Sequence, residues 1–133
     1  MKTSLSWVLV LSLTFLLQLS CEESSDCELN DYSMPEMELL DPEDGVIVLP
    51  YQGSYPQVSL HLKAEAGLNT LAMEDPYGYQ RPIKAFTSGE TVLDYTFELR
   101  DFYESETVFV LHDLCNQRTE VEARIVFEQA PAK

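Results

Sequence analysis

Residues 57–66, QVSLHLKAEA, alternate between polar and apolar side chains at every position. The apolar positions are Val58, Leu60, Leu62, Ala64 and Ala66. Successive side chains of a β-strand point to opposite faces of its sheet, so a period of two predicts a half-buried strand with one face in solvent. The fold class depends on how often this pattern recurs along the chain.

The same period of two continues on both sides of this stretch. Residues 107–112 (TVFVLH) are apolar at nearly every position, which is typical of a central strand covered on both faces. Pro82 has no N–H to donate, so the segment around it is expected to be an edge strand or irregular. In chain order, the other strands are expected at residues 37–40, 46–49, 70–74, 79–86, 91–100 and 119–128.

Turn residues separate these strands. Pro42 and Gly45 lie between residues 37–40 and 46–49, so these two segments are interpreted as one edge strand broken by a kink. No stretch after Cys21 carries an apolar stripe with helical spacing. About seven short strands separated by turns predict an all-β protein, an antiparallel β-sandwich.

The last third of this pattern resembles bacterial immunoglobulin-like domains. Its parts are an alternating strand (residues 94–99), an apolar strand ending in an aspartate (107–113) and a final alternating strand (121–127). The resemblance implies an immunoglobulin-like sandwich over residues 36–129 and says little about activity. The tryptophan of antibody cores has no counterpart, because the single tryptophan is Trp7.

The N-terminus has the features of an export signal. Lys2 precedes the apolar run 5–17, which is shorter than the roughly 20 residues of a membrane-spanning helix. Ser20 and Cys21 then resemble the cleavage site of bacterial lipoproteins, in which the cysteine is lipidated. The acidic run 22–26 is similar to that of Bacteroidota lipoproteins exported to the cell surface. Plain secretion is the alternative.

This interpretation divides the chain into four parts. Residues 1–20 are a cleaved lipoprotein signal peptide, 21–35 an acidic tether, 36–129 the sandwich and 130–133 a C-terminal tail. The expected location is the cell envelope, at the outer membrane or cell surface, with the N-terminal lipid as the contact with the membrane.

Charge excludes one class of partner. The chain has 23 acidic and 8 basic residues, a formal net charge of −15, and the basic Lys2 belongs to the signal. Such a surface repels nucleic-acid phosphates and anionic headgroups. No nucleic-acid partner is expected.

The cysteines suggest one disulfide. If Cys21 carries lipid, Cys27 and Cys115 remain as a pair in an oxidising compartment. In an up-and-down arrangement of strands, both lie at the same end of the sandwich. Two free thiols are the alternative.

Aromatic side chains gather in three loops that the same arrangement places at the opposite end. Tyrosine combines rigid apolar area with a polar tip and suits recognition of a glycan or a protein. The alternative is that these rings fold back and plug the open end of the core. The candidate ligand-binding residues are Tyr51, Tyr55, Tyr77, Tyr79, Phe102 and Tyr103.

Signals for catalysis or metal binding are weak. His61 is expected on the polar face of a strand, and the spacing of His112 and Cys115 supplies only two of the four ligands of a structural zinc site. Asp41 and Asp44, with the glutamate between them, fit a turn better than a calcium loop. We therefore expect no cofactor, no metal and no enzymatic activity.

The sequence leaves three classes of function open: a binding module, an assembly subunit and, less favoured, a small enzyme. A binding module predicts exposed aromatic loops, whereas an assembly subunit predicts pairing through an exposed strand edge, at residues 79–86 or along the last strand. A small enzyme would need a deep pocket with convergent titratable groups.

Overall fold

The computed structural model describes residues 25–87, 89–102 and 106–133. The signal segment, Cys21 and Tyr103 lie outside this part of the chain. In chain order, the described elements are α2 (Ser25–Leu29), β1 (Glu36–Asp41), β2 (Val46–Leu49), β3 (Gln57–Lys63), β4 (Leu68–Glu74), β5 (Gln80–Ala85), β6 (Val92–Glu98), β7 (Glu106–Asp113) and β8 (Arg118–Phe127).

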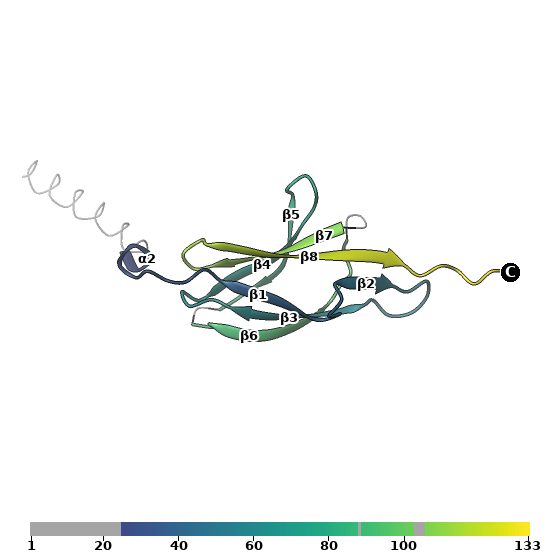
Figure 1. Ribbon diagram of the computed structural model, residues 1–133, viewed down its shortest axis with the longest axis horizontal. Coiled ribbons are helices and arrows are strands. Elements are labelled where there is room, and N and C mark those ends of the chain that lie inside the picture. Colours follow the sequence, from purple (N-terminus) through teal and green to yellow (C-terminus); the bar gives the residue numbers. More distant parts are fainter. Residues whose placement is uncertain (1–24, 88, 103–105) are drawn as a thin grey trace, which may run out of the picture. The chain divides into compact units, whose positions relative to one another are not determined.

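The eight strands form two sheets packed face to face (Figure 1). One sheet has the order β1-β3-β6 and the other has the order β2-β8-β7-β4-β5. All strand pairs are antiparallel except β2 with β8. The predicted all-β, immunoglobulin-like sandwich is therefore confirmed.

The expected kinked edge strand is divided between the two sheets. β1 pairs with β3, and β2 pairs in parallel with β8. The turn between them is closed by a hydrogen bond from the Gly45 N–H to the Pro42 carbonyl (3.1 Å), and Gly45 adopts a φ of 71° that glycine tolerates without strain. Because the expected first strand is divided in two, the described residues contain eight strands where seven were expected.

Alternation along the strands builds the core. The inner side chains of β3 are fully buried, and those of the central strand β7, Phe109 and Leu111, are buried as well. Removal of each such side chain from water stabilises the folded state by about 1.5–3 kcal/mol. The fully or nearly buried apolar residues of this core are Ile47, Leu49, Val58, Leu60, Leu62, Ala64, Leu68, Leu71, Met73, Leu99, Phe109, Leu111, Ala123 and Ile125.

Two parts of the predicted inner face are less covered than the alternation suggests. The inner side chains of β6, Leu93, Tyr95 and Phe97, are only half-buried. Phe127 continues the inward series of Ala123 and Ile125 on β8, but it is 60% exposed because it lies at the last position of its strand. The inner side chains of β3 and β7 are therefore fully covered, whereas those of β6 remain partly accessible to solvent.

The chain divides into two units between Asp31 and Tyr32. Within the first, α2 occupies part of the expected tether, and the Asn30 side chain donates to the Asp26 carbonyl (2.9 Å) at its C-terminal end. Within the second, the N–H and hydroxyl of Ser33 both donate to a carboxylate oxygen of Glu65 (3.0 and 2.9 Å). These two bonds lower the pKa of Glu65.

Both cysteines of the predicted pair are disulfide-bonded. Cys27 belongs to α2, and Cys115 belongs to the turn between β7 and β8. That turn is shaped by Asp113, whose Oδ1 accepts hydrogen bonds from the N–H groups of Cys115 (2.9 Å) and Gln117 (2.7 Å). The predicted disulfide therefore holds, and the alternative of two free thiols is wrong.

Candidate binding site

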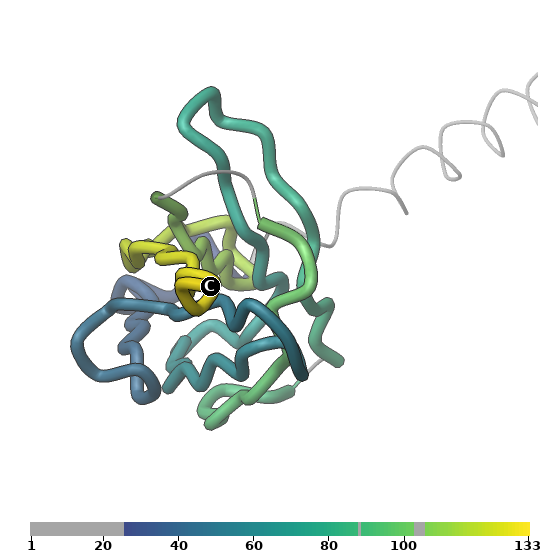
Figure 2. The backbone as a smooth tube through the Cα atoms, turned by 90° about the vertical axis from the view of Figure 1, so that its right-hand side faces the viewer, coloured from purple at the N-terminus to yellow at the C-terminus, as the bar shows by residue number. Residues whose placement is uncertain are grey.

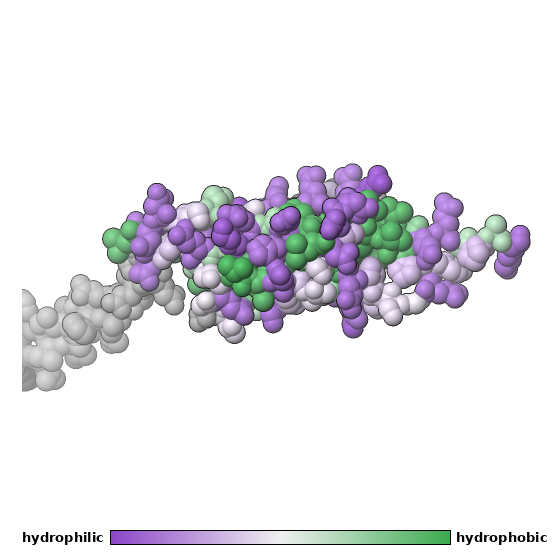
Figure 3. All heavy atoms as spheres, turned by 60° about the horizontal axis from the view of Figure 1, so that its bottom comes forward, coloured by the Kyte–Doolittle hydropathy of each residue, from purple (hydrophilic) through white to green (hydrophobic). Residues whose placement is uncertain are grey.

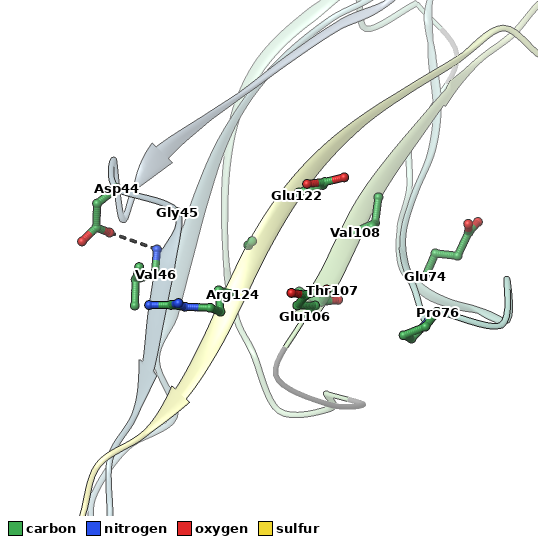
Figure 4. Close-up of a pocket in the computed structure, with 11 residues that line it drawn as sticks. Asp44, Gly45, Val46, Glu74, Pro76, Glu106, Thr107, Val108, Glu122 and Arg124 are labelled. Carbon is green, nitrogen blue, oxygen red and sulfur yellow. Dashed lines mark hydrogen bonds between the residues drawn. The ribbon is translucent and has the colours of Figure 1, made fainter.

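A groove of about 460 Å³ lies on the outer face of the five-stranded sheet. β7 and β8 form its floor, with Val108, Glu122 and Arg124 among the floor residues (Figure 4). Asp44, in the turn before β2, and Pro76, in the turn after β4, lie on opposite sides of it. The groove is open to solvent, with apolar and acidic groups along the same surface.

Strand pairing explains which side chains share this surface. In the ladders, Val108 of β7 is paired with Glu122 of β8 on one side and with Glu74 of β4 on the other. Since directly paired residues point to the same face of a sheet, these three side chains form one row across the groove. The parallel pairing of Val46 with Arg124 extends the surface to β2.

The carboxylates of the groove are held by different partners. Glu74 accepts hydrogen bonds from Arg118 (3.0 Å) and from the Gln80 amide (2.7 Å). These two bonds lower the pKa of Glu74, and Glu74 and Glu120 together raise the pKa of Arg118. Asp44 accepts a hydrogen bond from the Val46 N–H (3.0 Å) and so fixes the turn that forms one wall.

Negative charge exceeds positive charge in the groove. The lining residues include four carboxylates, Asp44, Glu74, Glu106 and Glu122, and one cation, Arg124. Within the described part of the chain, Glu106, Glu122 and Arg124 form no ion pair. The groove therefore favours a ligand that carries positive charge beside an apolar surface.

The β4–β5 hairpin beside this groove presents two of the predicted tyrosines. Tyr77 is 82% exposed and Tyr79 is 72% exposed. Asp75 holds the turn, because its Oδ1 accepts hydrogen bonds from both tyrosine N–H groups (2.9 and 2.8 Å) and its carbonyl accepts one from Gly78 (3.0 Å). Both rings are thus displayed on a hydrogen-bonded turn.

Tyr51 and Tyr55 lie on the loop between β2 and β3, where they are 57% and 53% exposed. The Arg100 guanidinium lies over the Tyr55 ring, 5.8 Å from its centroid, within the range of a cation–π contact. A cleft of about 190 Å³ beside Tyr55 is lined by Phe102 and Phe127, whose rings meet edge to face at 5.7 Å. Phe102 therefore packs on the end of the core.

Exposed apolar side chains also gather where β2 and β8 end. Val48 is paired with Val126, and the two are 52% and 37% exposed, while Phe127, the next residue of β8, points to the other face of the sheet and is 60% exposed. Figure 3 shows apolar side chains near the end of the sandwich from which the C-terminal tail leaves, and further apolar groups among the polar side chains of the same face.

The five predicted aromatic residues that the structure describes do not form one surface. The loops that carry them are tied together at their bases, by the bond from the Leu99 N–H to the Pro56 carbonyl (2.9 Å) and by Arg81 and Asp101 (3.7 Å). Figures 1 and 2 nevertheless show the hairpin projecting from the body of the sandwich, away from the loop after β2. Tyr77 and Tyr79 thus form one group, Tyr51 and Tyr55 another, and Tyr103 lies outside the described residues.

The weaker chemical candidates occupy separate places. His61 pairs through Nδ1 with Asp94 on the outer face of the three-stranded sheet, whereas His112 lies in β7 of the other sheet. Asp41 ends β1, and Asp44 belongs to the turn described above. No group of three or more histidine, cysteine or acidic side chains that could hold a metal ion occurs among the described residues.

Sequence reasoning missed the groove because its residues come from four strands whose order in the sheet was unknown. The available signal was the outward row of charged residues on β8, Arg118, Glu120, Glu122 and Arg124. Their neighbours on β7 and β4 become known only with the ladders.

In the described ranges, no helix has the length and apolar character needed to cross a membrane. No protein-family model matches the sequence, and no curated protein matches it either.

Proposed function

We propose that this chain is a lipid-anchored envelope protein with a non-catalytic binding domain, and that the β4–β5 hairpin and the groove beside it form the ligand-binding surface. The observation that carries the proposal is the pair of exposed tyrosines, Tyr77 and Tyr79, on a hydrogen-bonded turn. Large, rigid side chains lose little conformational entropy on binding, so tyrosines presented in this way often dominate recognition.

The groove supports a ligand with positive charge. Pro76 lines the groove and immediately precedes Tyr77, so the tyrosine turn borders the acidic surface. A protein segment with lysine or arginine would complement Glu106 and Glu122 and cover the apolar Val108. A neutral glycan would use the tyrosines and leave these carboxylates in solvent.

Site-specific photo-crosslinking in producing cells tests this proposal. A benzoylphenylalanine at position 77 or 79 is expected to yield an adduct, identified by mass spectrometry, because either ring would contact the ligand. The control is the same probe at Gln52, which is exposed on the loop after β2. Adducts no more abundant at 77 and 79 than at 52 would contradict the proposal.

The identified ligand then allows an affinity measurement. Tyr77→Ala and Tyr79→Ala are each expected to weaken binding by about 30-fold, as for a central aromatic contact. Tyr51→Ala is the matched control on the other tyrosine loop. For a basic protein ligand, Glu122→Gln is also expected to slow association and reduce its dependence on salt; an unchanged affinity of this variant would favour a glycan.

A further inference from the structure

The outer strand β6 is the least protected edge of the sandwich. It ends the order β1-β3-β6, so one side of β6 has no neighbouring strand among the described residues. In Figures 1 and 2, β6 runs along the margin of the sandwich opposite the side from which the β4–β5 hairpin projects. Seven residues, VLDYTFE, therefore present an open edge.

The other outer strands carry features that discourage pairing. β5 contains Pro82 between two basic residues, β2 has only four residues, and β1 carries three acidic side chains. β8, which we considered as an edge from the sequence, lies between β2 and β7. β6 has neither proline nor a basic residue, and it carries two acidic side chains, Asp94 and Glu98.

The hydrogen-bonding groups of β6 that face the open edge can be identified. The Ala64 N–H bonds to the Thr91 carbonyl, and the Leu99 N–H bonds to the Pro56 carbonyl, each within a directly opposed pair. In an antiparallel ladder, bonded pairs alternate with non-bonded pairs. The odd-numbered residues from 91 to 99 therefore bond to β3, and the even-numbered residues, Val92, Asp94, Thr96 and Glu98, direct N–H and C=O outward.

The apolar face of β6 is also incompletely covered. Leu93, Tyr95 and Phe97 are half-buried, whereas the residues opposite them on β3, Leu62, Leu60 and Val58, are fully buried. Tyr95 and Phe97 line a cleft of about 210 Å³ together with Pro82 and Ile83 of β5. An additional strand beside β6 would cover these rings with its own inward side chains.

We infer that the partner is a second copy of this chain, paired antiparallel through β6 about a two-fold axis at Tyr95. In this register, Asp94 faces Thr96 of the other copy and Val92 faces Glu98. Leu93 faces Phe97, and the two Tyr95 residues face each other. The strand is thus complementary to itself, as an isologous interface requires.

The neighbouring registers are excluded by charge. The N–H and C=O groups at the open edge belong to even-numbered residues. A register of the two β6 strands is therefore possible only if even-numbered residues of one copy face even-numbered residues of the other. With the two-fold axis at Asp94, the Asp94 carboxylates of the two copies would face each other. With the axis at Thr96, Asp94 of each copy would face Glu98 of the other. Like charges directly opposite each other destabilise a ladder. The axis at Tyr95 avoids both.

The register predicts opposite effects of two substitutions at one position. Thr96→Asp places a carboxylate opposite Asp94 of the partner, twice per dimer, and is expected to raise the dimer Kd about tenfold. Thr96→Lys places a cation there and is expected to lower the Kd by a similar factor. Sedimentation equilibrium of the full chain over a range of concentrations measures both.

Three controls separate the interface from folding and from net charge. Thr96→Asn resembles Thr96→Asp without its charge and is expected to dimerise like the wild type. Gln52→Asp and Gln52→Lys repeat the charge changes on the loop after β2, away from β6, and should leave the Kd unchanged. Circular dichroism confirms that each variant is folded.

A cysteine experiment tests the register itself. Asp94→Cys and Thr96→Cys chains, mixed and oxidised, are expected to give a mixed disulfide-linked dimer, while neither variant alone gives a linked dimer through the new cysteine. Self-linking of either variant, a monomeric wild type at all concentrations, or equal Kd values for Thr96→Asp and Thr96→Lys would each overturn the inference.

Discussion

Arg118 is the residue that joins the strands of the groove most directly. Its guanidinium bonds to Glu74, across β7 on β4, and to Glu120 on its own strand (3.0 and 2.8 Å). The Glu74 side chain is only 16% exposed, whereas that of Glu120 is 53% exposed. The contact with Glu74 is therefore less screened by water and has the larger expected effect on stability.

Glu74→Gln is expected to lower the free energy of unfolding near neutral pH by about 0.5 kcal/mol, because it removes one charge of a partly buried pair. The folded-state pKa of Glu74 is below its ordinary value of 4.5, so its contribution is present above pH 4.5 and is lost as pH falls through the lowered pKa.

Urea unfolding at about pH 7 and about pH 3 measures this difference. The wild type and Glu74→Gln should differ at the higher pH, and the difference in their free energies of unfolding should be smaller at the lower pH. Glu120→Gln is the matched control and is expected to have a smaller effect at both. An equal effect of the two substitutions would show that burial does not distinguish the two contacts.

Local residue chemistry could be predicted where it depends on neighbours in the sequence. The turn Asp75-Pro76-Tyr77-Gly78 has proline at its second position and glycine at its fourth, which are the positions where β-turns favour them, and Asp75 closes it. The bond between Arg118 and Glu74 spans 44 positions of the chain and depends on the order of three strands, so no local pattern indicates it.

Among the connecting elements, the turn between β3 and β4 depends most closely on glycine. Gly67 has a φ of 105°, and a Cβ atom there would lie 2.7 Å from Leu114 Cδ1 and 3.3 Å from its Cγ. The Gly67 carbonyl also accepts a hydrogen bond from the Leu114 N–H (3.0 Å). This turn thus packs against the turn that follows β7.

Gly67→Ala is expected to destabilise the protein by about 2–3 kcal/mol, from backbone strain together with the contact with Leu114. Gly78→Ala is the matched control: its φ is 85°, but nothing lies within 4 Å of the added Cβ, so strain alone remains. Thermal unfolding compares the two. If Gly78→Ala costs as much as Gly67→Ala, the contact with Leu114 has no effect on stability.

The strands themselves were predictable because each buries one face, which produces the period of two. The division of the first strand between two sheets was only partly predictable: the Pro42–Gly45 turn indicated a kink, but the parallel partner of β2 lies far away in the chain. The helix α2 escaped prediction because five residues are too few to show a helical period.

For the whole molecule, the pattern of strands was sufficient to predict a sandwich but not to define its surfaces. The predicted up-and-down arrangement correctly placed the bases of the three aromatic loops near one another. It could not show that the hairpin projects from the body, because the length and direction of a projecting turn depend on packing with other strands. The four loop tyrosines that the structure describes therefore form two groups rather than one face.

Attachment to a membrane is a property of the whole chain and is tested by its mass. Extracted from membranes, the wild type is expected to carry a diacylglyceryl-sized increment that Cys21→Ala lacks, because Cys21 would be the lipidated residue. Measured with and without reductant, the same samples should gain two hydrogens as the Cys27 and Cys115 disulfide opens. A soluble wild type of unmodified mass would contradict the anchor.

The parallel pairing of β2 with β8 has a mechanical consequence. Because the two strands run in the same direction, tension that pulls the start of β2 and the end of β8 apart acts along the strands rather than across them. The hydrogen bonds that join residues 46–49 to residues 124–127 then bear the force together. In a hairpin pulled from its two ends, by contrast, the bonds would break one at a time. The domain is therefore expected to withstand stretching forces better than its modest size suggests.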